Sequence, residues 1–316
     1  MELLKKLTMC PAPSGREEKI RELIKSEAGK YADEIYEDTL GNLIVKKGRG
    51  GKKIVILSHM DEIGVVVTYK DEKGFLKFAP VGGLKTKDLV GRRVEFENSE
   101  IGVIGVHDDT DKYEISKMFI DVSGSENISV GDMAVFTGEF YENETHVISK
   151  ALDNRAGCYV ALKTLQSIKS DNELYFVFTV QEEVGLRGAK TATYGIDADF
   201  AVAVDVTMVG DTPGGKEMNV KLGGGAAIKV MDRSVICHSQ VRDTLIETSA
   251  KNNIPYQLEI LTAGGTDAGA VHVSGTGIKT GAISIPTRYI HSPSEMICKS
   301  DLNACIELLK EYIKSM

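Results

Sequence analysis

The chain has 316 residues, of which 42% are hydrophobic and 27% charged, a balance typical of a globular protein with a sizeable core. Its formal charge is −8 and its basic residues are scattered, so we expect it to bind neither nucleic acid nor an anionic membrane. It lacks a signal-peptide pattern and any run of about 18 apolar residues, which predicts a cytoplasmic protein. Five widely spaced cysteines argue against a disulfide framework and a thiolate zinc site, and we expect mostly buried thiols.

The beginning of the chain predicts one helix followed by strands. Ser14 and Glu17 have the spacing of a capping box, and apolar residues then recur at helical spacing over about 15–31. Three strands are expected next, at about 33–37, 42–47 and 54–58. The third, Ile54–Ser58, has four consecutive apolar residues, which is typical of a strand buried on both faces, and His59 follows it.

Between about residues 66 and 145 the sequence changes to short alternating segments separated by glycines, with no long helical pattern. Four of these segments are expected to be strands, at 75–78, 93–96, 101–106 and 133–136. This pattern predicts a small β-rich domain, PDZ-like or a barrel, over 66–145. It would be inserted into a catalytic domain formed by residues 1–65 and 146–316.

The remainder of the chain alternates helices with strands, as in an α/β domain. Helices are expected near 154–169, 239–252 and 301–314, and strands near 174–180, 199–206, 256–261 and 279–285. The predicted fold class is therefore α/β, a helix-flanked mixed sheet with an inserted β-rich domain.

Acidic and histidine residues stand where several predicted strands end. His59 and Asp61 are two apart on an extended segment, so their side chains project from the same side. Glu182 and Glu183 follow a later strand, and Asp205 closes the one after it. Because ligands bind outside the carboxyl ends of the strands in an open parallel sheet, these residues are expected to converge on one edge.

Asp153 and His291 carry weaker local signals. Asp153 stands immediately before a helical pattern, where capping the helix is the simpler interpretation. His291 lies in a turn-rich segment, where a histidine is often merely solvated. Together with the strand-end residues, the two supply enough ligands for two divalent metals and leave one carboxylate free to activate water.

The order of these residues resembles that of the dinuclear metalloaminopeptidases of the tetrahedral type, which include glutamyl aminopeptidases and proteins once labelled cellulase M. The matching segments span nearly the whole chain, at residues 12–15, 59–64, 151–155, 181–185, 264–268 and 291–293. One departure is Leu84 after the Gly82–Gly83 pair, where a bulky aromatic residue is expected in many relatives, and the chain has no Trp.

The resemblance implies two divalent metal ions per subunit, Zn²⁺ or Co²⁺ or else Mn²⁺. Asp153 would bridge them, with His59 and Asp205 completing one site and Glu183 and His291 the other. The peptide bond that follows the bridging aspartate is expected to be cis.

The resemblance also implies roles for residues that do not bind metal. Glu182 would be the catalytic base, taking a proton from a metal-bridging water and returning it to the leaving amine. Asp61 would orient the first histidine ligand. Gly265, Thr266 and Asp267 would border the substrate pocket.

The function implied is an aminopeptidase that removes N-terminal residues from short peptides, with the inserted domain forming dimers and the dimers closing into a homododecamer. Related deacylases, dipeptidases and carboxypeptidases are alternatives, although their dimerising domain usually falls later in the chain. A glucanase is disfavoured, because adjacent glutamates are not naturally held across a sugar and the chain has no Trp. A metal-stabilised assembly protein is disfavoured by the oxygen-rich ligand set.

Overall fold

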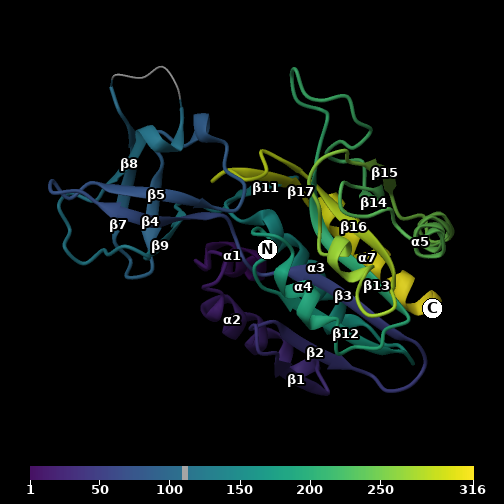
Figure 1. The fold of residues 1–316 in the computed structure, drawn as a ribbon. Helices are drawn as coiled ribbons and strands as arrows, with labels where there is room; N and C mark the ends of the chain where they lie inside the picture. The colour runs from purple at the N-terminus through teal and green to yellow at the C-terminus, as the bar shows by residue number, and fades with distance from the viewer. Residues whose placement is uncertain (109–112) are drawn as a thin grey trace.

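Two β structures make up the fold, a large sheet and a smaller barrel (Figure 1). The computed structural model describes residues 1–108 and 113–316. The predicted fold class, a helix-flanked mixed sheet with a β-rich insertion, is confirmed, and the insertion is a closed barrel. None of the helices in the described part of the chain is both long and apolar enough to cross a membrane. The five cysteines are free thiols and four are buried, as expected.

The large sheet has 11 strands in the order β1-β2-β12-β3-β13-β16-β17-β11-β10, and β14 joins β15 to β16. Its strands are β1 (Glu34–Glu37), β2 (Leu43–Lys47), β3 (Lys53–His59), β10 (Tyr141–Glu142), β11 (His146–Ser149), β12 (Glu173–Thr179), β13 (Phe200–Met208), β14 (Ala226–Met231), β15 (Tyr256–Ile260), β16 (Lys279–Arg288) and β17 (Glu295–Cys298). The neighbours β12, β3, β13 and β16 are parallel, so their carboxyl ends lie at one edge of the sheet.

Helices cover both faces of this sheet. The described helices are α1 (Glu2–Met9), α2 (Glu18–Ala28), α3 (Leu152–Ser167), α4 (Arg187–Ala192), α5 (Ser239–Lys251), α6 (Ala268–Val271) and α7 (Lys299–Ser315), with 3-10 turns at Gly29–Tyr31, Thr86–Asp88 and Ile115–Lys117. In β3, Ile54 and Ile56 pack with α1, α2, α3 and α7, whereas Val55 and Leu57 pack on the opposite face with α4 and α6. The covering of both faces explains the apolar run Ile54–Leu57 in the middle of the strand, which is buried as predicted.

The barrel closes in the order β4-β5-β8-β7-β6-β9 and lies at the left of Figure 1. Its strands are β4 (Gly64–Lys70), β5 (Leu76–Val81), β6 (Arg93–Phe96), β7 (Ile101–Val106), β8 (Met118–Asp121) and β9 (Met133–Phe136). The four segments expected in this region correspond to β5, β6, β7 and β9. The barrel has its own core, which includes Val65, Leu76 and Ile120, and Leu84 packs against that core.

The predicted capping box before α2 is wrong. The helix begins at Glu18, and the residue at its N-cap, Glu17, makes no side-chain capping bond. Ser14 instead donates its hydroxyl to Asp61 Oδ2 at 2.6 Å, and Glu17 accepts the backbone N–H of Gln181 at 3.1 Å. The helix is shorter than predicted, because the side chains of Ser14 and Glu17 bond to residues that are distant in sequence and do not cap the helix.

Arg155 ties the beginning of the chain to α3, and its side chain is fully buried. Its guanidinium donates to the carbonyl oxygens of Met60, Leu7 and Cys10 at 2.7, 2.5 and 3.0 Å. It also lies 3.5 Å from Glu62 Oε1. A single side chain therefore satisfies several buried acceptors that belong to separate segments.

Replacing this arginine is expected to destabilise the protein strongly. Arg155→Met removes the donors and leaves the Glu62 carboxylate buried with less compensation, so the free energy of unfolding should fall by about 3–5 kcal/mol. Chemical denaturation measures the loss. The matched change at the exposed Arg49, Arg49→Met, should cost less than about 0.5 kcal/mol. Equal losses for the two variants would contradict the anchoring role of Arg155.

Candidate active site

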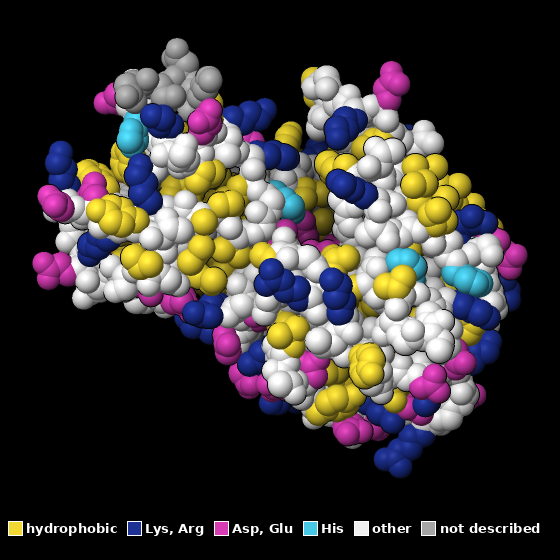
Figure 2. Space-filling model, viewed as in Figure 1, with side chains coloured by type: hydrophobic (Ala, Val, Ile, Leu, Met, Phe, Trp, Pro, Cys, Tyr) yellow, Lys and Arg dark blue, Asp and Glu magenta, His cyan; other side chains and the backbone are white. Residues whose placement is uncertain are grey.

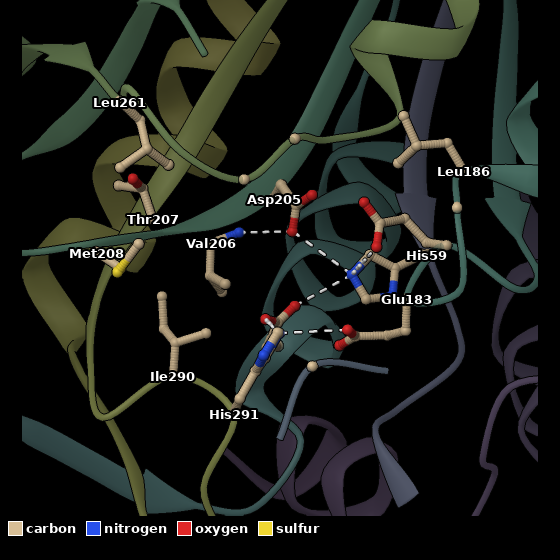
Figure 3. A pocket seen from close by; sticks show the side chains of 16 residues that line it. His59, Glu183, Leu186, Asp205, Val206, Thr207, Met208, Leu261, Ile290 and His291 are labelled. Atoms are coloured by element: carbon tan, nitrogen blue, oxygen red, sulfur yellow. Dashed lines mark hydrogen bonds and ion pairs between the residues drawn. The ribbon is translucent and has the colours of Figure 1, made fainter. Parts of the chain in front are cut away.

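The side chains singled out in the sequence meet at the carboxyl edge of the parallel strands, around a cavity of about 410 Å³. They are His59 at the end of β3, Asp153 near the start of α3, Glu182 and Glu183 after β12, Asp205 in β13 and His291 after β16. Figure 3 shows several of them pointing toward one another. Figure 2 shows a hollow between the barrel and the α/β layers, with acidic side chains inside it.

Asp153 lies between the two histidines. Its Oδ1 is 3.1 Å from His59 Nε2, and its Oδ2 is 3.4 Å from His291 Nε2. Asp205 Oδ1 is 3.7 Å from His59 Nε2, and Glu183 Oε2 is 3.3 Å from His291 Nε2. One carboxylate thus faces two imidazole–carboxylate pairs, with a separate oxygen toward each.

The backbone around Asp153 explains why this residue does not cap α3. Ala151 occupies the N-cap position, and the peptide bond between Asp153 and Asn154 is cis, as expected. Glu295 accepts the backbone N–H groups of Asp153 and His291, both at 2.9 Å, and is 2% exposed. Glu295 was not singled out in the sequence, where its only signal is an acidic residue at the start of a short apolar strand.

Asp61 is fully buried behind His59. Its carboxylate accepts the backbone N–H groups of Glu182 at 3.0 Å and Glu183 at 3.2 Å, together with the hydroxyl of Ser14. Its Oδ1 is 3.3 Å from His59 Nδ1. Asp61 therefore lies against the imidazole ring and also bonds to the turn that carries both glutamates.

The loop that was expected to border the substrate pocket is only partly in the cavity. Gly265 lines the cavity, whereas Thr266 and Asp267 are 3% and 2% exposed beside it. Thr179, the last residue of β12, donates its hydroxyl to Asp267 Oδ2 at 2.5 Å. Asp267 thus anchors the end of the strand that leads to the two glutamates. Burial raises the pKa of Asp267 to about 6.

The barrel contributes a glycine turn to the site. A Cβ atom on Gly83 would lie 3.0 Å from His291 Nδ1, and one on Gly82 would lie 3.2 Å from the Glu183 side chain. Gly82 also has a φ of +82°, which residues with a side chain rarely adopt. Both positions therefore favour glycine, a role that the sequence did not reveal.

The site concentrates carboxylates in a poorly hydrated environment. Burial raises the pKa of Glu182 and of Asp205 well above the usual values, and it also raises that of Glu183. Burial alone would lower the pKa of His291, but the carboxylates of Asp153 and Glu183 raise it to about 11. Such an arrangement is favourable when cations neutralise the acidic groups.

The chemistry of these donors fits divalent metals. Imidazole and carboxylate ligands without a thiolate suit Zn²⁺, Co²⁺ or Mn²⁺. Two groups, His59–Asp153–Glu183 and His59–Glu182–Asp205, each have ligand atoms within 4.8 Å of one another. Among the described residues, Glu183 Oε1 is buried and has no hydrogen-bond partner. A bound cation would give this oxygen a partner and balance its charge.

A profile of the M42 glutamyl aminopeptidase family matches residues 41–308. The chain belongs to this family. A putative aminopeptidase of Acetivibrio thermocellus is 54% identical, over 99% of this chain and 98% of the relative. A solved aminopeptidase of Desulfurococcus kamchatkensis is 39% identical with a TM-score of 0.95, over 100% and 94% of the two chains. A Pyrococcus horikoshii TET1 peptidase is 34% identical with a TM-score of 0.87, over 100% of this chain and 99% of that one. It is described as assembling into a tetrahedron or a large octahedral shell.

Family membership identifies the chain as an aminopeptidase, a hydrolase of peptide bonds. It confirms the resemblance seen in the sequence, and it favours aminopeptidase activity over the deacylase, dipeptidase, carboxypeptidase and glucanase alternatives. The family is one of metallopeptidases, which agrees with the cluster of histidine and carboxylate side chains at the edge of the sheet.

Proposed function

We propose that this aminopeptidase holds two divalent metal ions, Zn²⁺, Co²⁺ or Mn²⁺, and removes N-terminal residues from short peptides. The observation that carries the proposal is the position of Asp153, with one oxygen toward each histidine. His59 and Asp205 would complete one metal site, and Glu183 and His291 the other. Asp153 would be shared between the two.

Glu182 is the carboxylate left over in this scheme. Its side chain is 11% exposed, and its Oε2 lies 4.0 Å from His59 Nε2. Divalent ions in the site would supply Lewis acidity toward the scissile carbonyl and toward water. Glu182 would accept the proton of the attacking water and then deliver it to the leaving amine. Glu182 would hold this proton between the two steps.

The proposal is tested with aminoacyl-p-nitroanilides and protein loaded in turn with Zn²⁺, Co²⁺ and Mn²⁺. We expect p-nitroaniline release only after loading, with about two ions per chain by elemental analysis. The same substrates with an acetylated amine serve as the control, since an aminopeptidase requires a free N-terminus. Full activity with one ion, or equal cleavage of blocked substrates, would contradict the proposal.

We further propose that the barrel forms a dimer interface and that the dimers close into a dodecamer. The TET1 peptidase of similar structure is described as forming a tetrahedron, which supports closed assembly. Ile101 and Val103 on β7 are 47% and 43% exposed, and apolar side chains are visible on the barrel in Figure 2. An enclosed site would admit only short or unfolded chains.

Light scattering tests the assembly. The metal-loaded chain should run as a dodecamer, and chelation is expected to release smaller species because the metal ligands come from several loops. Replacing Ile101 and Val103 together by Asp should also reduce the particle size, whereas Leu40→Asp in the exposed β1–β2 turn should not. A fully active, metal-loaded monomer at micromolar concentration would refute the assembly.

A further inference from the structure

We propose that the preferred N-terminal residue of the substrate is apolar, a leucine or methionine, and is neither acidic nor basic. This inference rests on the proposed aminopeptidase function and names the substrate class of the same site. It concerns the part of the cavity that surrounds the metal-binding residues.

Among the described residues, the cavity has no charged side chain apart from the six candidate metal-binding and catalytic residues. The other lining residues are four glycines, one threonine and five apolar residues. The apolar residues are Leu186, Val206, Met208, Leu261 and Ile290. Away from the six candidate metal-binding and catalytic residues, the side chain of the first residue of a peptide therefore meets mostly apolar atoms and glycine backbone, with Thr207 as the one polar side chain among the described lining residues.

Three of these side chains form a surface that we call the apolar wall, made of Met208, Leu261 and Ile290. They come from the end of β13, the loop after β15 and the segment after β16. In Figure 3 they lie together on one side of Asp205, with Leu186 on the other. Met208 and Leu261 are partly exposed and belong to no hydrophobic cluster of the described residues. Covering them with an apolar side chain would remove this apolar surface from water.

A buried cation behind the wall is not available to a substrate. Thr207 lines the cavity and donates its hydroxyl to Glu259 Oε1 at 2.8 Å, and Lys229 pairs with the same carboxylate. Lys229 is 1% exposed and also lies 3.4 Å from Asp232 Oδ2. Two carboxylates thus neutralise this lysine, and meeting a third in the cavity would require breaking buried ion pairs.

Two further cations, Arg288 and Lys85, also have partners. Arg288 donates to both carboxylate oxygens of Asp211, at 2.9 and 2.8 Å. Lys85 donates to the carbonyl oxygen of Ile290 at 3.1 Å and does not line the cavity. A glutamate side chain in the cavity would meet no lysine or arginine among the described lining residues, and a lysine side chain would lose its hydration against the wall. Burying an unpaired charge is far less favourable than burying a leucine.

The test compares kcat/KM of the metal-loaded enzyme for the p-nitroanilides of Leu, Met, Glu and Lys. Leu and Met are expected to exceed Glu and Lys by at least about a hundredfold. Leu261→Arg places a cation in the wall and should raise the Glu-to-Leu ratio of kcat/KM at least about tenfold. The matched control Leu258→Arg, at a 42% exposed position on β15, should leave that ratio unchanged.

The outcomes separate this inference from the proposed function. A preference for Glu or Lys, or equal values for all four substrates, overturns the apolar preference alone. Cleavage of none of them overturns the proposed function and the inference with it. A rise in the Glu-to-Leu ratio with Leu186→Arg and not with Leu261→Arg would overturn the assignment of the wall. Inhibition of the unmodified enzyme by free leucine, and much weaker inhibition by free glutamate, provides a second readout that needs no variant.

Discussion

Glu182→Gln is expected to lower kcat by about a hundredfold or more while the metal content stays near two ions per chain. The amide keeps the shape of the side chain and removes the basic oxygen that would accept the proton of water. Steady-state kinetics and elemental analysis of the same preparation measure the two effects. The pattern expected is a loss of turnover without a loss of ions.

The neighbouring residue provides the matched control. Glu183 Oε2 lies 3.3 Å from His291 Nε2, so Glu183→Gln should cost the protein metal as well as activity. The contrast is informative because Glu182 also lies close to His59 and Asp205. If Glu182→Gln lost metal and Glu183→Gln did not, the roles of the two glutamates would be exchanged.

Asp153→Asn is expected to have the largest effect on metal binding, with the loss of both ions and a fall in kcat/KM of more than about a thousandfold. A carboxylate with one oxygen toward each histidine cannot be replaced by an amide without weakening both sites. Asp205→Asn is the comparison. Of the two histidines Asp205 faces only His59, so this substitution should cost the protein one ion. Retention of one tightly bound ion in Asp153→Asn would contradict the bridging role.

The positions of His59 and Asp205 were predictable because each closes the apolar run of its strand, where a polar residue has no packing role, although β13 continues past Asp205 to Met208. Parallel neighbours then bring these ends together, as the register of β3 and β13 shows. The local sequence around Asp153 allows two interpretations, since a place before a helix also suits a cap. Only its surroundings, with a histidine on either side, distinguish the two roles.

The features that could not be predicted depend on partners far along the chain. Ser14 bonds to Asp61 across 47 residues, and Asp153 to Glu295 across 142. A local pattern such as a capping box describes only what a side chain can do near its own helix. When a buried carboxylate elsewhere offers a better partner, the tertiary bond prevails and the local pattern misleads.

The Gly82–Gly83 turn brings the barrel, the candidate assembly surface, beside two of the candidate metal-binding residues. Removing the barrel would open the site beside Glu183 and His291, so an excised α/β half is a poor stand-in for the whole enzyme. A barrel transplanted from a relative would need glycines at the two positions that lie beside Glu183 and His291. Changes in assembly and in turnover would then be linked, because the same barrel carries the turn beside the site and the exposed β7 side chains proposed for dimer contacts.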